Sequence, residues 1–382
     1  MSAGGARDAL TGLRFLAALH VVVFHFGGVW FEALPGWLQA ISACGYASVG
    51  LFYVLSGFVL SYNYLTPDGR LKAEPRSFWA ARLARVYPVY ALALLLLAPP
   101  VIQGSLEANT PAVAAAKLLA GGLSALLLVH AWLPPLALYW NPPGWSVSVE
   151  AFFYAVFPLA AAWVGRLRRG QLWGALGGLW MLGLLPSLLY LGLQVDGGLN
   201  VLKFNPLLRL PEFLMGLVLG RFFLWESATP RPSGAFLATA AALLTLGVFA
   251  FSPAVPFVLL HNALLAPVFG ALVYGLARGG GPLGWVLSRP LCVRLGEASY
   301  ALYILQYPVW KACQALAEAV APWADFRAPK PLFAVYLVLL VGLSWLTYRL
   351  FEMPLRSWGR KRLQGWVERG ALHRPSASPG TP

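Results

Sequence analysis

Charged residues are scarce in this 382-residue chain: Asp, Glu, Lys and Arg make up 11% of it, against roughly 25% in an average soluble domain. Such a chain cannot cover a water-facing surface, which excludes a soluble enzyme, a nucleic-acid-binding protein and a disordered protein. Hydrophobic residues make up 59%, and the mean hydropathy is +0.67. The composition therefore indicates an integral membrane protein.

Cysteine is rare as well. The three cysteines, Cys44, Cys292 and Cys313, are widely separated and lack C-x-x-C spacing, and the five histidines show no ligand spacing. We therefore predict neither a disulfide framework nor a metal site. The sequence also lacks a Walker loop and the G-x-G-x-x-G, H-E-x-x-H and G-x-S-x-G motifs.

Long apolar stretches are abundant. A helix that crosses about 30 Å of hydrocarbon needs about 20 mostly apolar residues. Eleven stretches qualify as candidates: 10–30, 44–64, 86–102, 113–133, 147–165, 172–192, 207–225, 234–251, 257–277, 298–320 and 332–351. The stretch 113–133 is the weakest, because it contains Lys117 and the pair Gly121–Gly122 and stops at Pro134–Pro135.

The basic residues between these stretches orient the chain and account for its net charge of +14. If 113–133 is re-entrant or peripheral, every basic cluster falls on one face, which the positive-inside rule makes cytoplasmic. Most of the 28 Lys and Arg residues then lie on the cytoplasmic face. Six lie on the outer face or have no assigned face: Lys117, Lys203, Arg209, Lys311, Arg327 and Lys330. We therefore predict an all-α, multi-pass protein of the inner or plasma membrane, with about ten transmembrane helices and both termini cytoplasmic.

Two parts of unequal size are expected. Residues 1–358 are predicted to form the transmembrane domain, and residues 359–382 a cytoplasmic tail that is basic at its start and disordered from Ala371.

Arg14 and His25 are the most informative ionisable residues within a predicted span. They are 11 residues apart, which places them within ~20° of the same helix face and ~16 Å apart along the axis. Each costs roughly 2.5–3.5 kcal/mol to insert, so each is a site hypothesis. The alternative is a snorkelling Arg14 with a hydrogen-bonded structural histidine. His20 lies on another face and is predicted to be structural.

A second motif is Arg82-Leu-Ala-Arg85, placed in a cytoplasmic loop at the mouth of a span. Arginines at i and i+3 share one helix face and form a fork suited to phosphate oxygens. The alternative is ordinary positive-inside anchoring.

A third motif runs from Trp145 to Glu150. Ser146 or Ser148 is predicted to cap the next helix, and Glu150 in the first turn would suit the helix dipole. In the functional interpretation, Glu150 enters the membrane from the side nearer His25, where it orients or charges the imidazole or binds an acceptor hydroxyl.

Two further segments place polar groups inside spans. Leu51 to Phe58 contains Ser56 and Gly57, which by itself is a helix-packing motif. In the segment from Glu297 to Gln306, Tyr303 and Gln306 are i, i+3 neighbours and are both expected to face the interior of the bundle.

Taken together, these motifs resemble the membrane acyltransferase-3 family, bacterial O-acyltransferases of surface polysaccharides, peptidoglycan and some antibiotics. Arg14 to His25 is similar to the family's R-x10-H, and Phe52 to Phe58 to its F-F-x-L-S-G-F. Arg82 to Arg85 resembles its R-x-x-R. Trp145 to Glu150 is similar to its W-S-x-x-x-E, and Ser299 to Tyr303 with Phe351-Glu352 to its closing pair.

The resemblance runs from about residue 8 to 358 and has two departures. Family members often carry histidine where this chain has Gln306, and fused members continue into an SGNH domain that is not expected here.

The resemblance implies transfer of an acyl group from cytoplasmic acyl-CoA, with acetyl-CoA favoured, to a hydroxyl of an extracytoplasmic or membrane-associated acceptor. No permanently bound cofactor is expected. The acceptor would be a carbohydrate, a lipid-linked compound or a small molecule. The implied catalytic residues are His25, Glu150 and Arg14, and the implied donor-binding residues are Arg82, Arg85, Arg14, Ser56 and Tyr303.

The implied roles follow the position of each residue. Arg82 and Arg85 would bind the CoA phosphates, and Arg14 would guide the pantetheine or the acyl carbonyl. His25 would act as general base or carry the acyl group transiently.

A secondary transporter or flippase for an anionic or glycolipid substrate would also need intramembrane Arg, His and Glu. Such transporters commonly show inverted repeats with matched broken helices, and the sequence contains no such pair. A membrane scaffold is a third interpretation, against which the ionisable residues within the spans argue. No nucleic-acid partner is expected, and the sequence does not indicate an oligomeric state.

Overall fold

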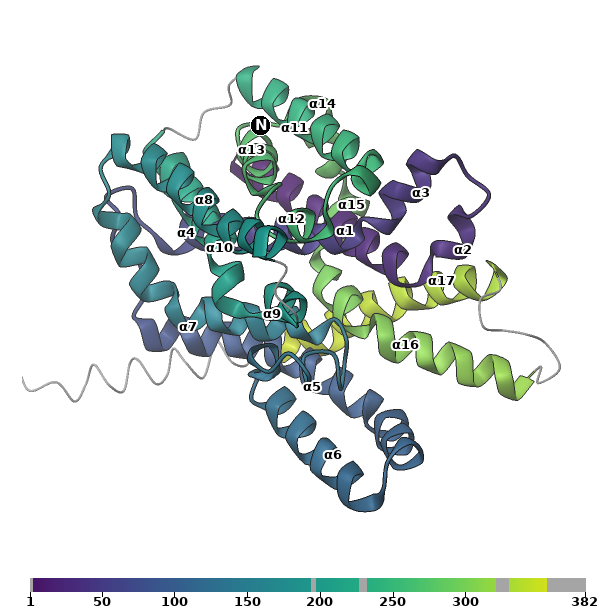
Figure 1. Cartoon of the computed structure of the whole chain (residues 1–382). Coiled ribbons are helices and arrows are strands. Elements are labelled where there is room, and N and C mark those ends of the chain that lie inside the picture. Colours follow the sequence, from purple (N-terminus) through teal and green to yellow (C-terminus); the bar gives the residue numbers. More distant parts are fainter. Residues whose placement is uncertain (1–2, 194–196, 227–231, 321–329, 356–382) are drawn as a thin grey trace, which may run out of the picture.

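The computed structural model describes residues 3–193, 197–226, 232–320 and 330–355, which fold almost entirely into helices (Figure 1). Within these ranges no β-strand forms, and a single isolated bridge joins Leu65 to Leu71. The prediction of an all-α protein is confirmed. The predicted tail, 359–382, lies outside the described residues.

Eleven longer helices make up the body of the molecule. They are α1 (Ala3–Phe26), α4 (Ser48–Tyr64), α5 (Pro75–Ala108), α6 (Pro111–Leu126), α7 (Gly144–Arg166), α8 (Arg169–Leu193), α10 (Pro206–Trp225), α11 (Pro232–Ala250), α13 (Ala266–Ala277), α16 (Ser299–Val320) and α17 (Lys330–Thr347). Shorter elements connect them: α2 (Gly28–Phe31), α3 (Gly36–Ala43), η1 (Gly45–Ala47), η2 (His130–Trp132), α9 (Gly198–Phe204), η3 (Ser252–Ala254), α12 (Phe257–His261), α14 (Gly281–Leu287), α15 (Pro290–Glu297) and a π-helical turn, η4 (Tyr348–Glu352).

Among the described residues, seven helical segments are long and apolar enough to cross a membrane. They are Arg7–Phe26, Gly36–Tyr64, Pro75–Ala108, Gly144–Arg166, Arg169–Leu193, Phe257–Ala277 and Lys330–Leu355. The other predicted spans form α10, α11 and α16, which fall outside this set; α10, for example, contains three charged side chains. Helix α6 is also outside the set, because its 16 residues extend only about 24 Å. The structure thus supports a multi-pass protein with at least seven candidate spans.

Helices α4 and α10 pack closely at the centre of the bundle, where both backbones carry glycine. A Cβ on Gly57 would lie 2.0 Å from the carbonyl oxygen of Phe213, and one on Gly216 would lie 1.9 Å from that of Val54. Neither position has space for a larger residue, so the predicted packing role of Gly57 is confirmed.

Prolines inside the helices free carbonyl groups that side chains from neighbouring elements then satisfy. Pro308 has no N–H to give to the carbonyl of Ile304, which instead accepts from Asn141 Nδ2 at 3.1 Å. In the same way Pro158 frees the carbonyl of Tyr154, which accepts from Trp79 Nε1 at 2.9 Å. Such bonds hold α16 against the loop before α7, and α7 against α5.

Two local expectations were wrong. Arg82 and Arg85 do not lie in a loop, because α5 begins at Pro75 and continues through both arginines. Proline is favoured in the first turn, and the residues that follow it contain good helix formers.

The expected cap of α7 also fails. This helix begins at Gly144 after Pro143, with no side-chain cap. Ser146 donates to the Pro143 carbonyl at 2.9 Å, and Ser148 donates to Leu128 O at 2.6 Å.

Candidate active site

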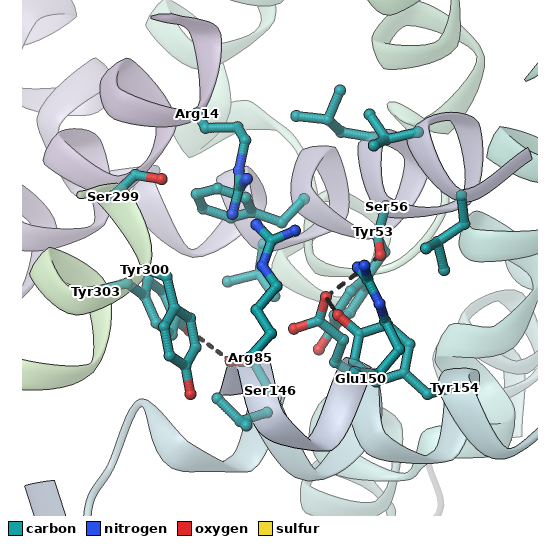
Figure 2. A pocket seen from close by; sticks show the side chains of 17 residues that line it. Arg14, Tyr53, Ser56, Arg85, Ser146, Glu150, Tyr154, Ser299, Tyr300 and Tyr303 are labelled. Atoms are coloured by element: carbon teal, nitrogen blue, oxygen red, sulfur yellow. Dashed lines mark hydrogen bonds between the residues drawn. The ribbon is translucent and has the colours of Figure 1, made fainter. Parts of the chain in front are cut away.

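Side chains from α1, α4, α5, α7 and α16 surround an open cavity of about 780 Å³ (Figure 2). These helices come from distant parts of the sequence, and they meet where several lining residues are small, among them Ser56, Ser146 and Ser299. Six of the seven predicted site residues line the cavity: Arg14, Ser56, Arg82, Arg85, Glu150 and Tyr303. The seventh, His25, lies outside its lining.

Three guanidinium groups and a single carboxylate give the cavity its charge. Figure 2 shows the Arg14 and Arg85 side chains pointing toward each other across the cavity, with Glu150 to one side. Within the described part of the chain, neither these two arginines nor Arg82 forms a salt bridge. The cavity therefore has an excess of positive charge that suits an anionic ligand, and phosphate oxygens in particular.

Aromatic side chains hold Arg82 in place. Its Nη2 donates to the hydroxyl of Tyr64 at 3.0 Å, and its guanidinium carbon lies 5.4 to 6.0 Å from the ring centres of Tyr64, Phe78 and Tyr154. Its Nε is buried and has no hydrogen-bond partner among the described residues. This cation–π environment orients the group without neutralising its charge.

Glu150 lies in the second turn of α7 rather than in the first, so the helix dipole alone does not explain it. Its Oε1 accepts hydrogen bonds from Tyr154 at 2.5 Å and from Ser56 at 3.3 Å. The carboxylate is thus fixed on the wall of the cavity by α4 and its own helix. The structure does not show the expected contact between Glu150 and His25.

Tyr303 reaches the same cavity from α16. Its hydroxyl lies 2.8 Å from Ser146 Oγ, which itself donates to the Pro143 carbonyl, so that the tyrosine hydroxyl is the donor to the serine. Both Tyr303 and Gln306 are buried, as their spacing predicted.

His25 is half-buried near the end of α1, the same continuous helix that carries Arg14. Its Nδ1 lies 2.8 Å from Gln306 Oε1. Its ring contacts Phe24, Phe26 and Tyr307, with ring centres 5.0 to 5.8 Å away. Gln306 Nε2 also donates to the carbonyl of Tyr303 at 2.7 Å, so α16 links the histidine to the cavity.

Two other histidines serve packing. His20 uses both ring nitrogens, with Nδ1 2.8 Å from Ser48 Oγ and Nε2 2.7 Å from Ile41 O, which confirms its structural interpretation. His130, in the segment between α6 and α7, is buried, and this burial lowers its pKa to about 4. Among the described residues, no group of three or more His, Cys, Asp or Glu is placed to hold a metal ion.

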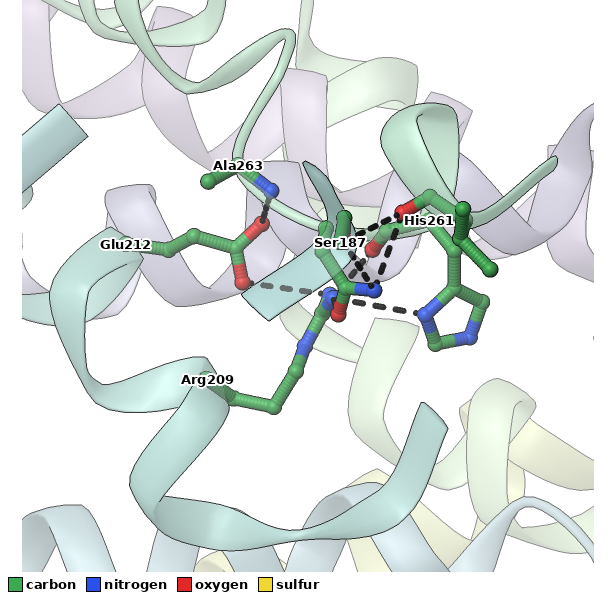
Figure 3. Close-up of polar contacts among 7 residues, drawn as sticks. Ser187, Arg209, Glu212, His261 and Ala263 are labelled. Carbon is green, nitrogen blue, oxygen red and sulfur yellow. Dashed lines mark hydrogen bonds and ion pairs between the residues drawn. The ribbon is translucent and has the colours of Figure 1, made fainter. Parts of the chain in front are cut away.

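A second group of buried charges lies between α8, α10 and α12 (Figure 3). Arg209 Nη2 is 3.1 Å from Glu212 Oε2, and Nη1 donates to Asn262 Oδ1 at 2.6 Å and to the His261 carbonyl. The other Glu212 oxygen accepts from the Ala263 N–H at 3.0 Å. Arg209 is 0% exposed.

Sequence reasoning missed two parts of this arrangement. Tyr154 is one helical turn after Glu150, so the i, i+4 spacing could have identified it. The pairing of His25 with Gln306 spans 281 residues and has no local sequence signal.

Comparisons with known proteins identify the family to which the chain is similar. The family model described as an acyltransferase domain (acyltransferase-3) matches residues 7–349. The acyltransferase MdmB of Streptomyces mycarofaciens is 29% identical over 376 residues, which cover 93% of each chain. The exopolysaccharide production protein ExoZ of Rhizobium meliloti is 29% identical over 83% of this chain and 92% of its own length. The O-acetyltransferase OatA of Staphylococcus aureus is 22% identical, and the match covers 92% of this chain but 57% of OatA. No solved structure matches the chain.

Proposed function

This chain belongs to the acyltransferase-3 family and is an O-acyltransferase, and we propose that it transfers an acyl group, acetyl in the first instance, from cytoplasmic acyl-CoA to a hydroxyl of an extracytoplasmic or membrane-associated carbohydrate or glycoconjugate. The names of two relatives support the chemistry and the acceptor class, since one is an O-acetyltransferase and the other an exopolysaccharide production protein.

The observation that carries this proposal is the cavity, in which three arginines face one carboxylate and none of them forms a salt bridge among the described residues. A CoA thioester presents phosphate groups at one end and a reactive carbonyl at the other. In the proposal Arg82 and Arg85 bind the phosphates, Arg14 guides the pantetheine or the carbonyl, and Ser56 and Tyr303 line the donor site.

The proposed topology has ten spans, with both termini cytoplasmic, in the inner or plasma membrane. The ten spans are the seven candidate segments together with α10, α11 and α16, while α6 is re-entrant or peripheral. In this orientation Arg82 and Arg85 face the cytoplasmic supply of donor, and His25 lies in the outer half of the membrane.

In the proposed reaction the acceptor hydroxyl oxygen attacks the thioester carbonyl carbon, and the carbon–sulfur bond breaks. His25 takes the hydroxyl proton and passes it to the leaving sulfur, so the products are an ester and free CoA. Transient attachment of the acyl group to His25 gives the same products in two steps. Because Arg14 and His25 are ~16 Å apart along α1, the acyl-pantetheine arm must extend along this helix.

The test is thiol release by the purified protein in lipid nanodiscs. Acetyl-CoA is supplied with one acceptor from each class: cellotetraose, a glycolipid and a small polyhydroxylated molecule. We expect free CoA to appear only when a suitable acceptor is present, together with an acceptor heavier by one acetyl group in mass spectrometry. His25→Ala is the control.

A different outcome would support the rival class. Movement of an anionic or glycolipid substrate across proteoliposomes, without thiol release under any of these conditions, would replace the transferase with a transporter or flippase.

A further inference from the structure

The environment of the His25 ring determines which of its two nitrogens carries the proton. The decisive residue is Gln306 on α16, whose side chain is buried between His25 and the backbone of its own helix. Its amide makes two hydrogen bonds, one at each end: Oε1 lies 2.8 Å from His25 Nδ1, and Nε2 lies 2.7 Å from the Tyr303 carbonyl oxygen.

The direction of these bonds follows from one fixed acceptor. A backbone carbonyl can only accept, so the NH2 group of Gln306 must face Tyr303 and its oxygen must face His25. An amide oxygen can also only accept, and His25 Nδ1 must therefore carry the proton. The lone pair of the neutral imidazole is then on Nε2, for which the described residues provide no hydrogen-bond partner.

His20, five residues earlier on α1, shows the opposite arrangement. Its Nε2 faces the Ile41 carbonyl and must be protonated, so Nδ1 accepts from the Ser48 hydroxyl. Both nitrogens of His20 are occupied. Of these two histidines on α1, only His25 keeps a free basic nitrogen.

We propose that Gln306 is a positioning residue that holds His25 as the Nδ1–H tautomer and so presents Nε2 to the acceptor hydroxyl. This inference rests on the proposed transferase function. As the acceptor oxygen bonds to the acyl carbon, the hydroxyl proton moves to Nε2, and Gln306 accepts from Nδ1–H throughout. The same proton then leaves Nε2 for the sulfur of CoA, which restores the neutral ring.

The surrounding helices keep this amide in place. Gln306 is 0% exposed, and its main-chain carbonyl accepts from the hydroxyl of Tyr336 on α17, which is also 0% exposed, at 3.2 Å. The histidine partner is therefore fixed by α16 and α17 together. In many proteins a carboxylate or a backbone carbonyl orients a functional histidine. Here the neutral amide of Gln306 occupies that position.

The first test reads the tautomer directly and needs no substrate. The full-length protein, labelled with 15N-histidine in lipid nanodiscs, contains only five histidines, and His25→Ala identifies the His25 signals. At neutral pH we expect His25 to show a protonated Nδ1 and an unprotonated Nε2, with His20 as the internal reference for the reverse tautomer. An Nε2–H tautomer at His25 would overturn the inference.

The second test uses variants with acetyl-CoA as donor and cellotetraose as acceptor. Gln306→Met preserves side-chain length but removes both hydrogen bonds. We expect a mixture of tautomers at His25 and a kcat lower by about 10- to 100-fold, with an unchanged KM for acetyl-CoA. Gln306→His, which again offers one N–H donor and one nitrogen acceptor, should restore most of kcat and the Nδ1–H signal.

The matched control is Ser48→Ala, which removes a hydrogen bond of the same length from His20 on the same helix and should leave kcat unchanged. A wild-type kcat in Gln306→Met, or a fall in kcat without a change in the His25 spectrum, would overturn the inference. Absence of transfer in the wild-type protein would instead count against the proposed function, and the tautomer measurement would still decide the role of Gln306.

Discussion

Two groups of charged side chains lie inside the helical bundle, and they differ in what surrounds them. In the cavity group, Arg14, Arg82 and Arg85 share about 780 Å³ of open space with Glu150 and form no salt bridge among the described residues. In the closed group (Arg209, Glu212, His261 and Asn262), the arginine is bonded to its neighbours, and its side chain is 0% exposed.

The difference shows that charge inside a membrane domain is not by itself the mark of a site. Inserting an arginine carries a similar cost in either place. In the closed group a carboxylate and carbonyl oxygens offset that cost, and the arginine side chain is fully buried. In the cavity group the positive charge is left for something that enters the cavity.

The helices around the two groups also differ. Gly57 and Gly216 bring α4 and α10, the helix that carries Arg209, into backbone contact, and the Arg209 guanidinium carbon lies 5.2 Å from the centre of the Tyr53 ring on α4. The cavity, in contrast, is lined by side chains from five helices, three serines among them. The ion pair thus lies beside a close helix–helix contact, whereas the candidate binding site lies where five helices meet.

The largest expected effect compares His25, which lies outside the cavity lining but contacts Gln306 on α16, with His261 of the closed group. His25→Ala should lower kcat by about 10²- to 10⁴-fold, the usual contribution of a general base, while leaving acetyl-CoA binding intact. His261→Ala, in the closed group, should retain kcat. Thiol release and equilibrium binding of acetyl-CoA measure both effects. Equal losses of kcat in the two folded variants would contradict the different roles assigned to His25 and His261.

The next effect compares the two carboxylates. Glu212→Gln leaves the buried Arg209 without its counter-charge, so we expect the free energy of unfolding to fall by about 3–5 kcal/mol. Glu150→Gln should change unfolding little, because its carboxylate contacts Ser56 and Tyr154 rather than a cation, but it should lower kcat. Thermal unfolding in nanodiscs and the rate of thiol release test the pair. A destabilised Glu150→Gln with normal kcat would contradict this assignment.

The smallest effect concerns donor binding. Arg82→Ala/Arg85→Ala should raise the KM for acetyl-CoA by about 10- to 100-fold, since bonds to charged groups contribute about 1.5–3 kcal/mol. The double variant Arg166→Ala/Arg168→Ala, at exposed positions near the end of α7, removes the same charge outside the cavity and should leave KM unchanged. If both double variants raise KM equally, Arg82 and Arg85 are topology anchors only.

Much of the cavity lining was predictable because the motifs are local. Arg82 and Arg85 share a helix face by their spacing and both line the cavity. Tyr303 lines it as well, and Gln306, on the same helix face as Tyr303, is buried as expected. The errors are also local. Residues 75–85 continue α5 instead of forming a loop, and Ser146 and Ser148 lie within α7 instead of capping it.

The contacts between helices could not be derived in this way. The sequence suggested that Glu150 would approach His25, because both were placed near the outer face. In the structure Glu150 is held by Ser56 and Tyr154, and the partner of His25 is Gln306, for which the sequence predicted only an inward-facing position on its helix. The sequence did not assign Arg209 to a face of the membrane, and its ion pair with Glu212 is visible only in the structure.

The sequence by itself determined that this is a helical membrane protein, which family it resembles and which rare charges need explanation. Apolar length and helical periodicity are properties of single segments, and they can be read from each segment in turn. Only the tertiary structure decided which charges face open space, which are neutralised and which nitrogen of His25 is free. Those properties depend on how close the helices lie and on the direction of hydrogen bonds between residues as far apart as His25 and Gln306.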